Sequence, residues 1–169
     1  YRPSYFPRGQ ERNWRQSCDR EVGFVRKTVG ICDVSTLGKI DIQGPDAAKL
    51  LDLIYTNKFS TLKVGKVRYG LMLREDGFVM DDGPSARLGE SHFLMTTTTG
   101  AAGEVMRHLE FVTQCLHPNW QVHLSSVTEQ WAQFAVAGPK SRELLNGLLE
   151  QPIDNDSFSF MACGDVRLP

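Results

Sequence analysis

Residues 40–51 read IDIQGPDAAKLL, and residues 134–145 read FAVAGPKSRELL. Each stretch has a short apolar segment, a Gly-Pro corner and a helical segment with paired leucines. Glycine accepts the tight turn of such a corner, and proline sets the φ angle of the first helical turn. The repeat therefore predicts two strand–helix units. With hairpin strands between them, they indicate an α+β fold in which helices layer on an antiparallel sheet, of ferredoxin-like character.

The segment between the two copies predicts hairpins. An Asp-Gly turn joins two strands over residues 67–82, and a second hairpin turns over Gly89 into residues 92–99. Residues 1–18 lack periodicity, so we expect an N-terminal arm or linker there. The size and composition of the chain suit one or two small globular units with a hydrophobic core. The other predicted elements are helices over residues 19–28, 45–55, 100–114 and 139–149, and strands over residues 31–34, 119–127 and 131–138.

Composition narrows the classes of function. The 169 residues carry a formal net charge of −1 and hold no basic block suited to a phosphate backbone, so we expect no nucleic-acid partner. No apolar run reaches the ~20 residues that span a bilayer, so we expect no membrane partner. The four cysteines and four histidines show no metal-ligand spacing, so no metal site is expected. Isolated cysteines favour reduced thiols and a cytoplasmic location.

Two adjacent aspartates, Asp81 and Asp82, follow the apolar run at residues 78–80. Side chains alternate along a strand, so one aspartate should face solvent and the other should face inward, toward Tyr69 on the partner strand. An inward carboxylate can accept from two donors at once, as offered by the N–H and NH₂ edge of a pterin or a guanine. Turn or capping roles are the alternative. The threonines at residues 96–99 are a strand end of high β propensity, or a set of hydroxyl donors.

Three longer stretches carry a family resemblance. They are VRKTVGICDVSTLGKIDIQGPDAAKLLDLIYTN at residues 25–57, KVRYGLMLREDGFVMDDG at residues 66–83 and HFLMTTTTG at residues 92–100. Together they resemble the N-terminal half of the glycine-cleavage T-protein (aminomethyltransferase) family. Within that family they are most similar to the folate-binding domains in the alpha subunits of heterotetrameric sarcosine oxidases.

The resemblance implies an enzyme that handles one-carbon units. Such a domain binds tetrahydrofolate, receives the imine from oxidative demethylation of sarcosine and directs its carbon into methylenetetrahydrofolate. The family's key carboxylate matches Asp81, which is thereby the expected catalytic residue. The folate-binding positions match Leu37, Tyr69, Asp81 and Thr97. No metal ligand is implied.

The same resemblance implies partners and limits. The intact complex would hold FAD, FMN and NAD outside this chain, together with beta, gamma and delta subunits. The family's later Tyr/Glu-bearing stretch and arginine do not occur here, so residues 19–169 match only the N-terminal portion of the folate-binding domain. We expect the chain alone to be inactive and to bind folate weakly or not at all. A free-standing aminomethyltransferase and a non-catalytic scaffold of the same fold are the alternative hypotheses.

Overall fold

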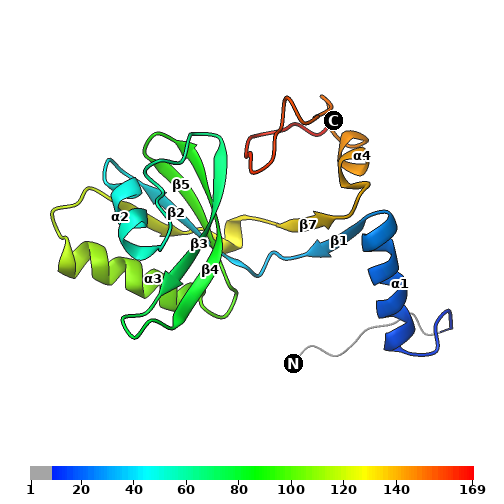
Figure 1. The fold of residues 1–169 in the computed structure, drawn as a ribbon, viewed down its shortest axis with the longest axis horizontal. Coiled ribbons are helices and arrows are strands. Elements are labelled where there is room, and N and C mark those ends of the chain that lie inside the picture. The colour runs from blue at the N-terminus through cyan, green and yellow to red at the C-terminus, as the bar shows by residue number, and fades with distance from the viewer. Residues whose placement is uncertain (1–8) are drawn as a thin grey trace. The chain divides into compact units, whose positions relative to one another are not determined.

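The computed structural model describes residues 9–169. The chain divides into two compact units (Figure 1). The larger unit comprises residues 34–133 and 155–165. The described part of the smaller unit comprises residues 9–33, 134–154 and 166–169. No helix among the described residues is long and apolar enough to cross a membrane.

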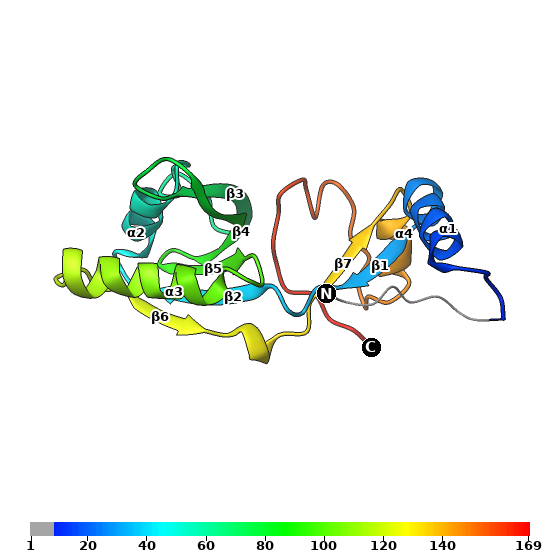
Figure 2. The ribbon, with the colours of Figure 1, turned by 90° about the horizontal axis from the view of Figure 1, so that it is seen from below.

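The larger unit is a five-stranded sheet with helices packed on it (Figures 1 and 2). The strand order is β3-β4-β5-β2-β6, and every neighbouring pair is antiparallel. The predicted α+β architecture is confirmed. The elements are β2 (Gly38–Gln43), α2 (Ala47–Ile54), β3 (Lys66–Leu73), β4 (Val79–Gly89), β5 (His92–Thr97), α3 (Ala102–Phe111), the π-helical turn Val112–Leu116, β6 (His123–Ser126) and the 3-10 turn Thr128–Gln130.

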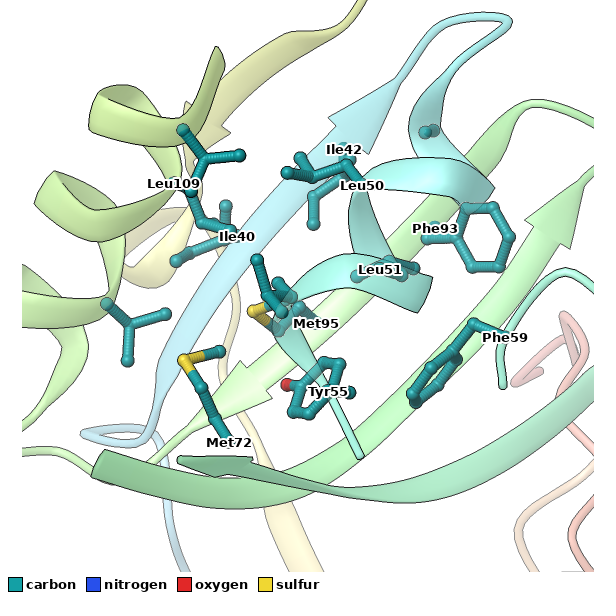
Figure 3. Close-up of a cluster of buried hydrophobic side chains, with 14 of the residues drawn as sticks. Ile40, Ile42, Leu50, Leu51, Tyr55, Phe59, Met72, Phe93, Met95 and Leu109 are labelled. Carbon is teal, nitrogen blue, oxygen red and sulfur yellow. The ribbon is translucent and has the colours of Figure 1, made fainter. Parts of the chain in front are cut away.

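One face of this sheet forms the core. Ile40 and Ile42 alternate along β2 toward the helices, and α2 returns Leu50 and Leu51 onto them (Figure 3). Leu109 of α3 joins the same buried cluster. Each such side chain contributes about 1.5–3 kcal/mol on full burial. The period of two in the strand and the leucine pair in the helix therefore fix which sheet face is covered.

The Gly-Pro corners of the repeat have the same geometry in both units. Gly44 has φ 135° and Gly138 has φ 129°, a region that favours glycine. A Cβ at Gly44 would lie 2.1 Å from the carbonyl oxygen of Gln121, and one at Gly138 would lie 2.5 Å from that of Thr28. Each corner thus needs glycine twice, for its φ angle and for a close backbone approach.

The smaller unit holds the second copy of the repeat. It contains α1 (Trp14–Lys27), β1 (Gly30–Asp33), β7 (Phe134–Ala137) and α4 (Ser141–Asn146), and β1 pairs antiparallel with β7. The expectation that the first helix starts at residue 19 is wrong. The side chain of Asn13 accepts a hydrogen bond from the amide of Gln16 and caps the helix there. Residues 1–8 of the expected arm lie outside the described residues.

The two expected hairpins share one strand. The first hairpin is expected to end at residue 82, but β4 runs unbroken through Gly83 and Pro84 into the second. Pro84 pairs with Tyr69 of β3, and the ladder between β4 and β5 begins one residue later, at Ser85. Because proline lacks an N–H, it is tolerated where the ladder is incomplete on one side. β4 consequently carries Asp81 and Asp82 just beyond the part of the strand that pairs with β5.

Candidate functional site

Asp81 lies on the covered face of the sheet. It pairs in register with Met72, a core residue, and only 4% of Asp81 is exposed. Directly opposed residues share a face, so Asp81 points to the same side as Met72. A carboxylate in such a place is costly to desolvate unless it is hydrogen-bonded.

The required donor comes from the end of β5. The main-chain amide of Thr98 donates to Oδ1 of Asp81 at 3.1 Å and to Oδ2 at 3.3 Å. A hydrogen bond to a charged acceptor is stronger than one between neutral groups. A carboxylate has about four lone-pair sites, so Asp81 keeps acceptor capacity for a further donor.

The start of β2 places the Thr98 amide. Gly38 pairs with Thr97, and a Cβ at Gly38 would lie 2.1 Å from the Thr97 hydroxyl and 2.5 Å from the Ala102 Cβ. Thr97 is buried, and its hydroxyl donates to the carbonyl of Thr98 at 3.2 Å. Leu37 precedes Gly38 and is half-buried. The structure therefore brings Leu37, Thr97 and Asp81 to the same end of the sheet.

Tyr69 lies on the other face of the sheet. It is 55% exposed, and its hydroxyl donates to Asp82. This hydrogen bond raises the pKa of Tyr69, with smaller contributions in the same direction from partial burial and from the charges of Asp82 and Asp81. The expectation that the inward aspartate faces Tyr69 is wrong. Tyr69 is three positions from Met72, so strand alternation turns it toward Asp82.

Two hydroxyl residues near the site were missed in the sequence. Tyr55 is 5% exposed and Ser85 is fully buried, and within residues 9–169 neither hydroxyl has a hydrogen-bond partner of good geometry. Burial raises the pKa of Tyr55 to about 12; Ser85 acts to lower it, and the charges of Asp81 and Asp82 raise it further. The Tyr55 ring lies in the core, 4.9 Å from that of Phe59 (Figure 3). Tyr55 follows the end of α2 and Ser85 lies within β4. Nothing in the sequence around either residue indicates that it lies near Asp81.

The described residues contain no group of three or more His, Cys, Asp or Glu side chains that could hold a metal ion. The chemistry of this end of the sheet therefore rests on one buried carboxylate, a main-chain amide and threonine hydroxyls. Such an arrangement binds and orients a hydrogen-bond donor. The individual roles of Leu37, Tyr69, Asp81 and Thr97 remain predictions.

Comparisons with known proteins show the family of the chain. A family model described as the GCVT N-terminal domain matches residues 1–168. The sarcosine oxidase subunit alpha of Rhizobium meliloti (strain 1021) is 55% identical over 99% of this chain, and that of Corynebacterium sp. (strain U-96) is 47% identical over 99%. The chain spans 17% of the length of each of these relatives.

A solved structure shows a similar fold. It is the glycine cleavage system aminomethyltransferase T from Bartonella henselae, with a TM-score of 0.72 and 25% sequence identity. The match covers 85% of this chain and 37% of the aminomethyltransferase chain. The resemblance read from the sequence is thus confirmed at the level of family and fold.

Proposed function

The chain belongs to the GCVT N-terminal domain family, and from this premise we propose that it forms the folate-binding part of a sarcosine oxidase alpha subunit. In that role it directs the one-carbon unit from oxidative demethylation of sarcosine onto tetrahydrofolate. The 55% identity to one such subunit supports the assignment. The observation that carries it is the buried, amide-held carboxylate of Asp81 at the position where the family resemblance places its key acid.

Asp81 suits the donor edge of a pterin. The Thr98 amide fixes the orientation of the carboxylate, and both oxygens keep lone pairs free for the adjacent N–H and NH₂ of a pterin ring. The exposed Thr98 and the half-buried Leu37 border this end of the sheet. We propose that a ligand reaches Asp81 past them, with Leu37 offering the apolar contact for the ring.

Tetrahydrofolate, when bound, supplies the nitrogen nucleophiles that take up the one-carbon unit to give methylenetetrahydrofolate. The part of the protein is positioning and electrostatic support. A carboxylate held in one orientation keeps its ligand in one pose, which lowers the entropic barrier to attack. Its negative charge also favours a cationic iminium nearby, since a fixed charge acts strongly away from bulk water.

The rest of the proposal concerns the intact enzyme. There the chain would work with the beta, gamma and delta subunits in a heterotetramer of the cytoplasm. FAD, FMN and NAD would be bound outside this chain, and the oxidation would be flavin chemistry. The overall reaction would make the complex an oxidoreductase acting on the CH–NH group of the amine, and this chain would pass the one-carbon unit to folate.

The proposal is tested with Asp81→Asn in the intact enzyme, with Asp82→Asn as the matched control. Without a folate acceptor the imine hydrolyses to formaldehyde, so the ratio of methylenetetrahydrofolate to formaldehyde reports on this site alone. We expect Asp81→Asn to lower the ratio by roughly a hundredfold, as for loss of a positioning contact. Asp82→Asn should change it little, because Asp82 lies on the other face. An unchanged ratio in Asp81→Asn would leave a non-catalytic scaffold as the better hypothesis.

A second candidate function is favoured by the structural match to an aminomethyltransferase. In that case the one-carbon unit would arrive on a lipoyl carrier protein rather than as a free imine. The two are distinguished by the donor: turnover with an aminomethyl-lipoyl carrier and none with sarcosine would favour the second candidate.

A further inference from the structure

Lys39 is a buried lysine in β2, an interior strand of the sheet that lies between β5 and β6. Only 3% of it is exposed, although lysine is rarely buried without a partner. Its Nζ donates to the carbonyl oxygens of Ser35 and Leu37, both at 2.8 Å. The ammonium thus binds two main-chain groups of one short loop, residues 34–37, which leads into β2.

This loop contacts the segment that holds Asp81. The hydroxyl of Thr99 donates to the hydroxyl of Thr36 at 3.2 Å. Thr99 follows Thr98, whose amide binds both oxygens of Asp81. A continuous series of contacts therefore runs from the Lys39 ammonium through the loop to the carboxylate.

The main chain of Lys39 is itself well fixed. Its amide donates to the Thr128 hydroxyl at 3.1 Å, and its carbonyl accepts from the Val127 amide at 2.9 Å. The other end of the loop is tied down as well, since the Val34 amide donates to the Gln133 carbonyl at 2.8 Å. The Lys39 side chain joins a rigid strand to the loop between these anchors.

We propose that Lys39 is a positioning residue for the Asp81 site, and this inference rests on the function proposed above. A buried ammonium is costly to desolvate, and an uncharged side chain of the same length would fill the space without that cost. Two charge-assisted bonds to carbonyls two residues apart orient both peptide planes. Thr36 is thereby held against Thr99, next to the Thr98 amide that fixes the direction of the Asp81 carboxylate.

The experiment uses Lys39→Met in the intact enzyme, with the exposed Lys63→Met as control. Thermal unfolding is measured first to establish that the variant is folded. We expect the KM for tetrahydrofolate to rise roughly tenfold to a hundredfold in Lys39→Met, with a matching fall in the ratio of methylenetetrahydrofolate to formaldehyde. Amide hydrogen exchange in residues 34–38 should quicken in the same variant. Lys63→Met should change none of these.

Different results of these experiments would overturn the inference about Lys39 and the proposed function. A folded Lys39→Met with unchanged KM and product ratio overturns the inference, as does a raised KM without faster exchange in the loop. If Lys39→Met does not fold, Thr36→Val carries the test, because it breaks the Thr36–Thr99 bond and leaves the ammonium in place; an unchanged KM in that variant overturns the inference. Asp81→Asn runs in the same assay. If it has no effect, the proposed function itself fails.

Discussion

The main-chain amide of Thr98 donates to both carboxylate oxygens of Asp81, at 3.1 Å and 3.3 Å. Apart from proline, no residue at position 98 removes this donor, so its presence depends on where β5 ends and on how closely β2 approaches. Asp81 is 4% exposed, and the bond therefore compensates part of the cost of placing a carboxylate there. The orientation of the Asp81 carboxylate in the candidate site therefore depends on the path of the main chain at Thr98.

Replacing Thr98 tests that bond directly. Thr98→Pro deletes the N–H, while Thr98→Ala keeps it and removes only an exposed side chain. We expect Thr98→Pro to lower the free energy of unfolding by about 1–3 kcal/mol, because a buried charged acceptor loses its donor. Thr98→Ala should stay within about 0.5 kcal/mol of the parent. Denaturant unfolding of both variants is the measurement, and equal stabilities would contradict the assigned hydrogen bond.

A substitution at Tyr55 is expected to raise, not lower, the free energy of unfolding. Among the described residues its hydroxyl has no partner, and its ring packs against Phe59. Tyr55→Phe keeps the ring and removes an unsatisfied buried group, so we expect it to raise the free energy of unfolding by about 1 kcal/mol. Tyr69→Phe, at an exposed tyrosine, is the control and should change it by less than about 0.5 kcal/mol. Destabilisation by Tyr55→Phe would mean that the hydroxyl has a partner, such as an internal water.

The pH dependence of stability follows from the same residue. Burial raises the pKa of Tyr55 to about 12 from its ordinary value of 10.0. The folded state thus favours the protonated phenol, and the resulting stability is complete below pH 10 and is lost as pH rises from about 10 to about 12. The difference corresponds to about 3 kcal/mol. Unfolding at about pH 9 and about pH 12 should show a larger loss in the parent than in Tyr55→Phe, and equal losses would refute the assignment.

The sequence predicts the features that depend on local geometry. The Gly44 and Gly138 corners are found with the φ angles that the Gly-Pro motif demands. The strand alternation that separates Asp81 from Asp82 is also found, with only Asp81 buried. These two predictions are possible because a turn and the alternation of side chains along a strand depend only on residues that are adjacent in the sequence.

Register and long-range contacts were not predictable in the same way. The face of Tyr69 depends on which residue opposes Asp81, and that register is set by the whole hairpin and its bulge between Met72 and Leu73. That the two expected hairpins share β4 was also not predictable, because the point where the ladder with β5 begins is a tertiary feature. The approach of Ser85 in β4 to Tyr55 at the end of α2 joins two elements whose spacing in the sequence carries no pattern.

Gly38 provides the last prediction, because it sets how closely β2 approaches the end of β5. In Gly38→Ala the new Cβ would lie 2.1 Å from the Thr97 hydroxyl and 2.5 Å from the Ala102 Cβ, so one of these neighbours must move. We expect a loss of about 1–3 kcal/mol in the free energy of unfolding, as for overpacking in a core. Gly100→Ala is the control, since its Cβ would meet nothing within 4 Å. A second change tests the contact with Ala102: Ala102→Gly should recover part of the loss. Strictly additive effects of the two changes would show that the approach to Ala102 is not what makes Gly38 necessary.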